Sequence, residues 1–438
     1  MRRRRAAGFA AVLALSLVAL GALAVTADDP VEVEEDDPYP GETLVSVQAY
    51  GWFGNYNGEV FVVDEAGDRQ WEYRPEDAAV FDAELLDNGH VMVSYGQRIP
   101  DEDCPERWRD TPQDHCIRNV VEEVDPATND RVWAHSWYDR YMSYHEVHDA
   151  DRLESGETAV IDMGQHRVFT VDRSGEVTWE WSAIEHLDEG SAFWTEHVEG
   201  TSRDDHSYEG PNQDWTHMND VDRLENGNFL LSIRNFDVVI EVDPETDDVV
   251  RVMGEPGNHS LMQEQHDPSY LSLHDTLIVS DSENDRVVEY DAETMEERWR
   301  YEGPSDGDRL QWPRDADRLP NGNTLVVDSR NFRVLEVNTT GDVVWGHDMT
   351  DDRAIVYDAD RLGPNRDLGE EPEHVPPGDD LDGTYYGEGV GGTLAYANSW
   401  IGFVFPHWVG LPGLLAILAA LSSGVGLAYE GYRYRRAT

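Results

Sequence analysis

Lysine is absent from this sequence, so all 33 basic side chains are arginines. The 438 residues also include 90 acidic side chains, which gives a formal net charge of −57. So strong a charge repels itself in dilute solution, whereas in about 1 M salt the Debye length falls to roughly 3 Å and the repulsion is screened. We therefore expect a halophilic surface, adapted to a salt-rich medium. Outside its ends the chain has no basic stripe, which argues against nucleic acid as a partner.

Cysteine is nearly absent, and the only two, Cys104 and Cys116, lie close together in the sequence. In an oxidising compartment such a pair forms a disulfide, which we expect here. His115 stands beside the pair, but a metal site needs a second pair of ligands that this segment does not offer. We therefore predict a disulfide and no metal at these residues.

A helical hydrophobic period is absent between the two ends of the chain, and 14 Trp and 19 Tyr argue against a disordered acidic chain. A short unit recurs instead. Its opening segments are FDAELL from Phe81, HDADRL from His148, NDVDRL from Asn219, HDPSYL from His266 and RDADRL from Arg314. Each leads through a polar turn into an alternating apolar strand and a second strand, usually followed by a Trp. Several strands per repeat are typical of a β-propeller blade.

One further unit is split between the two ends of the repeat region. TLVSV from Thr43 and FVVDEAGDRQW from Phe61 supply its later strands, and YDADRL from Tyr357 supplies its opening strand. Five full units and one split unit make six, and a split blade is how a propeller ring closes. We predict an all-β fold, a six-bladed β-propeller over residues 42–362. An insertion at residues 183–215 is expected to form either a functional lid or a surface excursion.

Apolar runs occupy both ends of the chain. Residues 1–27 read as a signal peptide or a transmembrane anchor, and both interpretations stay open. Residues 399–430 read as a transmembrane helix, followed by a basic cytoplasmic tail at 431–438. Acidic linkers are expected at 28–41 and 363–398. By the positive-inside rule, both basic ends lie in the cytoplasm, so we expect a cell-membrane protein with its propeller on the extracellular face.

The residue just ahead of the first Asp of each unit forms a column of six positions. Its members are Phe81, His148, Asn219, His266, Arg314 and Tyr357. Equivalent positions in six blades lie on one ring around the axis. A structural column would repeat one residue type, whereas this one varies and is strongly polar at four positions. The ring is therefore a candidate site.

Further cationic and imidazole side chains are expected near this ring. His217 lies two residues before the column position of its unit, and His145 lies close to His148. Arg234 and Arg330 occupy matching places on the next strands of the fourth and sixth units. Arginine binds oxyanions through two donors, and neutral histidine acts as a nucleophile or base. The alternative for any single histidine is a polar residue at a strand end, without chemistry.

The segment HMNDVDRLENGNFLLSIRNFDVVIEVD, from His217, resembles the arylsulfotransferase (aryl-sulfate sulfotransferase) family, in a membrane-anchored form of haloarchaeal type. In that family a His-x-Asn motif leads a strand, and a Gly turn and a Ser-x-Arg strand follow. QHDPSYL from Gln265, with Ser280-Asp281-Ser282 after it, resembles the family's second motif. The resemblance covers residues 44–362. It implies a six-bladed, extracytoplasmic transferase that needs no nucleotide sulfate (PAPS) donor.

By this resemblance, His266 is the nucleophile that becomes transiently sulfated. His217 and Arg234 would hold the sulfuryl oxygens, and His148 would be a further catalytic histidine, with His145 as its competitor. Substrate contacts are expected from Asn219, Arg314, Arg330 and His145. The substrates would be a small aryl sulfate donor and a phenolic or other hydroxyl acceptor, and the scheme needs no metal and no cofactor.

Two other classes of protein compete with this interpretation. A propeller can be a non-enzymatic cell-surface binding or scaffold module, because the fold does not fix the function. A quinone-dependent dehydrogenase also carries repeated Trp, but it uses more blades and a metal. The chain departs from the family pattern in lacking a separate N-terminal strand domain, in its C-terminal membrane helix and in the blade that carries its cysteines. Its acidity would also repel aryl sulfates unless salt screens it.

Overall fold

The computed structural model divides the chain into two compact units. Its described residues are 2–25, 33, 38–52, 54–100, 102–109, 115–140, 145–304, 309–363, 376–386, 390–406 and 409–436. The propeller unit comprises Val33–Ser305 and Leu310–Tyr385, and the helical unit comprises Met1–Glu32, Asp306–Arg309 and Tyr386–Thr438. Each unit is described by itself.

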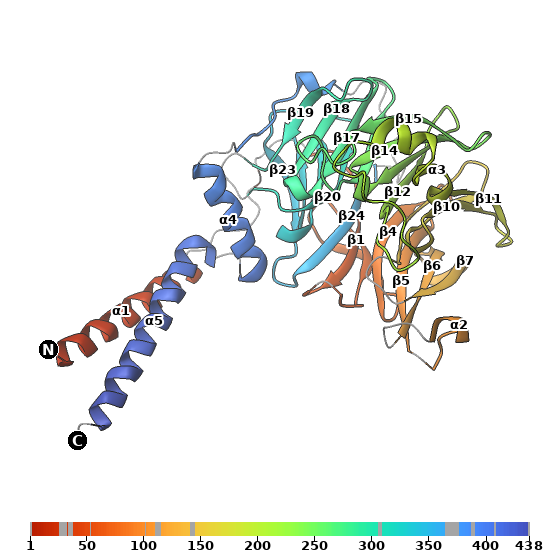
Figure 1. Cartoon of the computed structure of the whole chain (residues 1–438). Helices are drawn as coiled ribbons and strands as arrows, with labels where there is room; N and C mark the ends of the chain where they lie inside the picture. The colour runs from red at the N-terminus through yellow and green to blue at the C-terminus, as the bar shows by residue number, and fades with distance from the viewer. Residues whose placement is uncertain are drawn as a thin grey trace. The chain divides into compact units, whose positions relative to one another are not determined.

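The propeller unit contains six antiparallel sheets of four strands, one for each predicted repeat (Figure 1). Blade 1 has the order β24 (Ala354–Arg361), β1 (Thr43–Tyr50), β2 (Glu59–Val63), β3 (Arg69–Tyr73). Blade 2 is β4 (Ala78–Leu85), β5 (Val91–Pro100), β6 (His115–Asp125), β7 (Asp130–Arg140). Blade 3 is β8 (Val147–Arg152), β9 (Thr158–Asp162), β10 (Arg167–Val171), β11 (Val177–Ser182).

The later blades repeat the pattern. Blade 4 is β12 (Met218–Arg223), β13 (Phe229–Ile233), β14 (Val238–Asp243), β15 (Asp248–Gly254). Blade 5 is β16 (His266–Leu271), β17 (Thr276–Asp281), β18 (Arg286–Asp291), β19 (Glu297–Tyr301). Blade 6 is β20 (Pro313–Arg318), β21 (Thr324–Asp328), β22 (Arg333–Val337), β23 (Val343–Asp348). The predicted six-bladed propeller is confirmed.

The first strand of every blade faces the propeller axis. These six strands, β24, β4, β8, β12, β16 and β20, contact one another in a closed ring. The ring closes in blade 1, where β24 pairs with β1 from Thr43↔Arg361 to Tyr50↔Ala354. The strand from the far end of the chain therefore completes the first sheet, as the split repeat predicts.

Hydrophobic clusters and buried ion pairs join neighbouring blades. One cluster joins blades 3 and 4 and includes Trp181, Trp215 and Phe236, and another joins blades 6 and 1 and includes Phe61 and Trp345. An arginine at the end of an inner strand also pairs with a glutamate on the third strand of the preceding blade. The pairs are Arg152–Glu123 (3.3 Å), Arg318–Glu289 (2.8 Å) and Arg361–Glu336 (3.0 Å). The DADR repeat thus encodes contacts between blades as well as strands.

The insertion at residues 183–215 is packed into the propeller. It contains α3 (Ala183–Leu187) and a π-helical turn (Trp194–Val198). Leu187, Trp194 and Trp215 are buried in the cluster that joins blades 3 and 4. The short helix α2 (Glu106–Arg109) lies in a second insertion, between β5 and β6, and Cys104 and Cys116 form the predicted disulfide there, with Cα atoms 5.8 Å apart.

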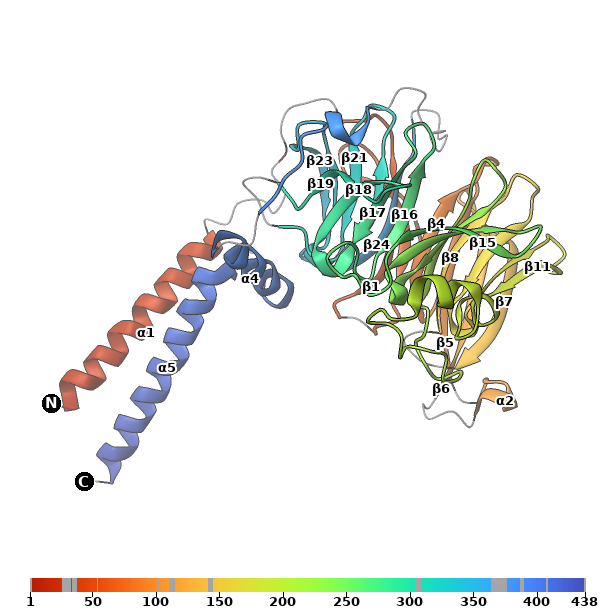
Figure 2. The ribbon, with the colours of Figure 1, turned by 45° about the horizontal axis from the view of Figure 1, so that its top comes forward.

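The helical unit holds α1 (Arg2–Val25), α4 (Val390–Val404) and α5 (Gly410–Arg435). α1 and α5 lie side by side (Figure 2), and Gly426 approaches the ring of Phe9 too closely for any larger residue. Both helices are long and apolar enough to cross a membrane, which is consistent with membrane anchoring.

The expected linker at 363–398 is more ordered than its composition indicates. Within it, α4 begins at Val390, and a 3-10 turn at Gly378–Asp380 precedes a segment that packs on the propeller. The Asp382 N–H donates to the Thr339 carbonyl at 2.9 Å. Residues 364–375 and 387–389, and most of the expected linker at 28–41, lie outside the described residues.

Candidate active site

A β-bulge at the same position of every inner strand places the six column residues. The strand register shifts at or beside each of them: Phe81, His148, Asn219, His266, Arg314 and Tyr357. A bulge bends its strand and re-aims the side chain that it carries. Because all six bulges lie on strands around the axis, the varied side chains gather in one place. We call this set the polar ring.

Tyr357 lies among residues contributed by four other blades. Its ring centroid is 5.3 Å from that of Phe81, 5.6 Å from that of His148 and 6.0 Å from that of His266. The guanidinium carbon of Arg314 lies 4.3 Å from the same centroid. The structure therefore brings together five of the six column residues around one phenol ring.

His266 is held in one tautomer by its neighbours. Its Nδ1 lies 3.1 Å from the Glu264 carbonyl oxygen and 2.8 Å from Ser282 Oγ. The Ser282 hydroxyl donates to the Pro313 carbonyl at 2.7 Å, so it can only accept from the imidazole. Nδ1 therefore carries the proton and Nε2 carries the lone pair. Among the described residues Nε2 has no hydrogen-bond partner.

His217 and His148 form a second imidazole pair, with ring centroids 5.3 Å apart. His217 Nδ1 donates to the Asp214 carboxylate at 2.8 Å, and His148 Nδ1 lies 3.4 Å from the Glu146 carbonyl. Burial, followed by the nearby cations, lowers the pKa of both histidines and of His266. All three imidazoles are therefore neutral at pH 7.

Arginine surrounds the same group. Arg234 donates to the Glu264 carboxylate and to Asn235 Oδ1, and its buried Nε–H has no partner among the described residues. The guanidinium carbons of Arg314 and Arg330 lie 4.0 and 4.1 Å from the Trp312 ring centroid. Arg314 also donates to Gln48 Oε1 at 2.7 Å. Cation–π contacts of this kind fix a guanidinium without neutralising its charge.

Three residues two positions ahead of the column adopt left-handed backbone conformations. They are His217 (φ +46°), Glu264 (φ +50°) and Trp312 (φ +55°), in blades 4, 5 and 6. Residues other than glycine rarely adopt such a conformation, and strain of this kind is concentrated at functional sites. It turns the chain immediately before each of these three inner strands.

Two of the residues predicted to contact substrate, Asn219 and His145, instead interact with other residues of the protein. Asn219 Nδ2 donates to the Gln265 carbonyl at 2.9 Å and so holds the residue before His266. His145 is buried with its Nδ1 3.2 Å from Asp139, and it does not line the axial cavity. His148 does line that cavity. The structure therefore brings His148 to the polar ring, and His145 lies elsewhere.

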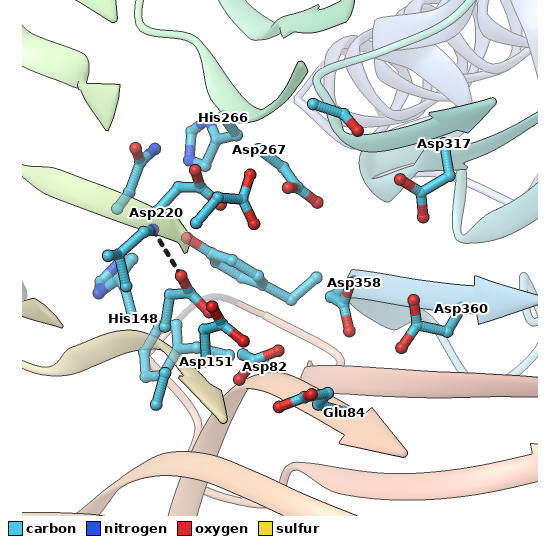
Figure 3. A pocket seen from close by; sticks show the side chains of 18 residues that line it. Asp82, Glu84, His148, Asp151, Asp220, His266, Asp267, Asp317, Asp358 and Asp360 are labelled. Atoms are coloured by element: carbon cyan, nitrogen blue, oxygen red, sulfur yellow. Dashed lines mark hydrogen bonds between the residues drawn. The ribbon is translucent and has the colours of Figure 1, made fainter. Parts of the chain in front are cut away.

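Carboxylates fill the axial cavity beside the polar ring. This cavity has a volume of about 250 Å³, and Figure 3 shows His148 and His266 on one side and Glu84, Asp317 and Asp360 on the other. The acidic side chains come from the two Asp or Glu positions of the repeated inner strand. They alternate with buried positions, so that residues two apart face the same side.

Sequence reasoning missed several residues that orient the polar ring. Ser282 and Glu264 hold His266, Asp214 holds His217, and Trp312 stacks between two arginines. Ser282 stands inside a recognised motif, two residues after Ser280, the strand partner of His266, and that motif was the available signal. Asp214, Glu264 and Trp312 belong to connecting segments with no repeated pattern, so the sequence gives no sign of their role.

The comparisons with solved structures return matches of low similarity. A protein of unknown function from Bacteroides caccae is 13% identical with a TM-score of 0.49, covering 73% of this chain and 98% of its own. A virginiamycin B lyase from Staphylococcus aureus is 10% identical with a TM-score of 0.38, covering 69% and 87%. A nidogen/laminin complex chain is 9% identical with a TM-score of 0.45, covering 73% and 97%. These values bear on neither substrate nor mechanism.

The family comparison is more specific. No curated protein matches the chain. A family model described as Arylsulfotransferase (ASST) matches residues 31–267, which is more than half of the chain and includes His148, His217, Arg234 and His266. The chain therefore belongs to the arylsulfotransferase family.

Proposed function

We propose that the protein moves a sulfuryl group from an aryl sulfate to a phenolic or other hydroxyl acceptor, without PAPS, through a sulfohistidine on His266. Membership of the arylsulfotransferase family indicates an aryl sulfotransferase at the family level. The observation that carries the finer proposal is the tautomer of His266. Two acceptors at Nδ1 leave a lone pair on Nε2, which is what a nitrogen nucleophile requires.

In the first half-reaction, Nε2 of His266 attacks the sulfur of the donor. The N–S bond forms while the S–O bond to the aryl group breaks, and its electron pair leaves with the phenolate, which takes a proton from solvent. Arg234 would donate to the sulfuryl oxygens, where negative charge is stabilised by fixed donors. His217 would donate to them from Nε2 once the anionic donor is bound and the imidazole takes up a proton, with its Nδ1–H held by Asp214. The unpartnered Nε–H of Arg234 supports this role.

In the second half-reaction, the acceptor oxygen attacks the sulfur of the sulfohistidine. Nε2 of His148 takes the hydroxyl proton, the N–S bond breaks, and its electron pair returns to His266. The low pKa of His148, caused by burial and then by His217 and Arg314, keeps it neutral and able to accept a proton. His148 then releases its proton to solvent, which balances the proton that the phenolate took up, and both histidines end in their starting states.

We further propose that the propeller works on the extracellular face of the cell membrane in a salt-rich medium. The two apolar helices and the basic residues Arg433 and Arg435 at the end of α5 support this arrangement. The net charge of −57 would repel an anionic aryl sulfate at low ionic strength. Activity should therefore rise with salt.

The test is a transfer assay with the full chain in detergent and molar salt, using 4-nitrophenyl sulfate as donor and phenol as acceptor. His266→Ala should lose at least about 10³-fold in kcat because the nucleophile is gone. His259→Ala, which changes a half-exposed histidine outside the polar ring, is the matched control and should keep full activity. Mass spectrometry of donor-treated protein without acceptor should find one SO₃ group on the peptide that contains His266.

Two results would overturn the proposal. One is an active His266→Ala variant, which would place the nucleophile elsewhere. The other is no transfer by the unaltered protein with several aryl sulfates, which would favour a surface binding module.

A further inference from the structure

The inner strands carry two sets of acidic side chains, and nearly all of them line the axial cavity. The first acidic ring has one Asp from each blade, and all of its members except Asp315 line the cavity: Asp82, Asp149, Asp220, Asp267, Asp315 and Asp358. The second acidic ring consists of Glu84, Asp151, Asp222, Asp317 and Asp360, and Ser269 takes the sixth place. Among the described residues that line the cavity, none is a lysine or arginine. The proposed sulfuryl transfer uses none of these carboxylates.

Backbone amides satisfy only part of the first acidic ring. Asp149 accepts from the Val221 N–H at 2.6 Å, and Asp315 accepts from the Ala359 N–H at 2.9 Å. Each of these bonds joins one blade to the next and occupies one carboxylate oxygen. In Asp315 the other oxygen, Oδ1, accepts no backbone amide among the described residues.

Several buried oxygens accept no hydrogen bond from an N–H or alcohol group in the described part of the chain. Asp315 Oδ1 and Asp220 Oδ2 are such atoms, in residues that are only 1% and 7% exposed, and both side chains contact the Asp267 carboxyl. The neutral amide oxygen of Asn219, which also lines the cavity, is a third, at 4% exposure. A buried acceptor without a donor costs free energy unless a proton donor or a cation meets it. An amide oxygen does not become protonated at neutral pH, so Asn219 points to an added ligand.

Three members of the first acidic ring are close enough to share one ion. One carboxylate oxygen from each of Asp267, Asp315 and Asp358 lies within 4.8 Å of the other two. Calcium accepts several protein carboxylates as ligands, whereas magnesium usually keeps several waters and is bound through one or two carboxylates, so a set of three favours calcium. Figure 3 shows Asp220, Asp267 and Asp358 around the same cavity.

We infer that the propeller binds a calcium ion on its axis, through the carboxylates of Asp267, Asp315 and Asp358. These residues belong to blades 5, 6 and 1, so the ion would join the split blade to its neighbours. It would also replace mutual repulsion among the carboxylates with attraction. This inference is independent of the proposed sulfuryl transfer, because it concerns the stability of the ring and needs no substrate.

The experiment measures calcium binding and thermal unfolding of the full chain in detergent and molar NaCl. Protein stripped with EDTA should bind about one Ca²⁺ per chain, measured by equilibrium dialysis and elemental analysis. Saturating Ca²⁺ should raise the melting temperature by about 5 °C, because a ligand that binds only the folded state stabilises it. Mg²⁺ at the same concentration should give a smaller shift.

Two isosteric variants test the ligands. Asp267→Asn keeps a residue type that tolerates the left-handed backbone (φ +43°) at this position, and Asp315→Asn keeps an oxygen for the Ala359 N–H. Both should lose calcium binding and the calcium-dependent shift, while melting higher than the unaltered protein in EDTA because one repelling charge is gone. Asp222→Asn, in the second acidic ring, is the matched control and should keep calcium binding.

The unaltered protein decides the question even if a variant does not fold. Less than about a tenth of an ion per chain, or a melting temperature that neither Ca²⁺ nor EDTA changes, would overturn the inference. An unchanged calcium shift in folded Asp267→Asn and Asp315→Asn would overturn it as well.

Discussion

The polar ring and the first acidic ring occupy consecutive residues of the same six strands, and they follow opposite rules. The polar ring has five residue types in six blades, whereas the first acidic ring has Asp in all six. Asp149, Asp315 and Asp358 each accept a backbone amide from the next blade. A repeat protein therefore keeps a residue where it assembles the ring and varies its neighbour where a substrate can be bound.

Burial shifts the pKa of the two rings in opposite directions. It lowers the pKa of His148, His217 and His266, and it raises the pKa of carboxyls such as Asp315 and Asp360. The histidines bind more protons in the unfolded chain than in the folded one. The free energy of unfolding is therefore highest above about pH 6.5, where both states are neutral, and it falls as the pH drops below that value. The carboxyls bind more protons in the folded chain than in the unfolded one. Their contribution to the free energy of unfolding is therefore fully present at low pH and is lost as the pH rises through the folded pKa.

The largest expected effect on stability comes from breaking one of the arginine–glutamate ion pairs that recur between neighbouring blades. Arg318→Ala would leave Glu289 buried without its partner, which should cost about 3–5 kcal/mol of unfolding free energy. Chemical denaturation of the full chain measures it. Arg298→Ala, which removes an exposed partner of Asp291, is the control and should leave the melting temperature unchanged. Equal behaviour of the two variants would contradict a structural role for the repeated arginine.

A substitution beside the polar ring should lower the rate of sulfuryl transfer and leave the fold intact. Arg234→Gln removes a charged donor next to His217 and His266, and kcat for aryl sulfate transfer should fall by about 10²–10³-fold. The melting temperature should stay within a few degrees of the unaltered protein. A variant that loses stability in proportion to its activity would show that Arg234 is structural.

The smallest expected effect concerns the pH dependence of the free energy of unfolding, for which the histidines and the buried carboxyls have opposite signs. Burial and the nearby Asp267 raise the pKa of Asp360 to about 7, so the free energy of unfolding should fall as the pH rises from about 4, where the unfolded side chain ionises, to about 7, where the folded one does. In EDTA, the stability gain of Asp360→Asn over the unaltered protein should therefore be larger at pH 8 than at pH 5, by about 2–3 kcal/mol. Urea denaturation at both pH values measures the difference. A stability gain that is the same at both would refute this assignment.

The repeat region made the fold predictable because each blade carries the same strand, turn and strand signals. The split unit even predicted which strands close the ring, and β24 does pair with β1. The ring positions of His148, His266 and Arg314 followed from alignment alone, since equivalent positions of a closed ring must meet. Local backbone conformation could not be predicted in the same way. The left-handed conformation at His217 and Glu264 has no sequence signal, because neither residue is glycine.

The acidic rings were visible in the sequence as Asp at every second position, yet alternation alone does not distinguish an outward face from an axial one. Only the closed ring of inner strands shows that these carboxylates face each other. The ordered segment after residue 376 was hidden for a different reason. Its Gly, Pro and acidic residues are typical of a linker, and backbone hydrogen bonds such as that from Asp382 to Thr339 hold it on the propeller.

The closure of blade 1 also decides how the molecule would respond to mechanical load. β1 starts at Thr43 and β24 ends at Arg361, and these two residues are direct partners at one end of the pair. A force that pulls the two tethered ends apart would therefore peel the strands, breaking hydrogen bonds one after another from the Thr43–Arg361 pair. Traction on both ends in the same direction would place no such load on the pair. Two anchors in one membrane would thus leave this seam under less tension than anchors drawn in opposite directions.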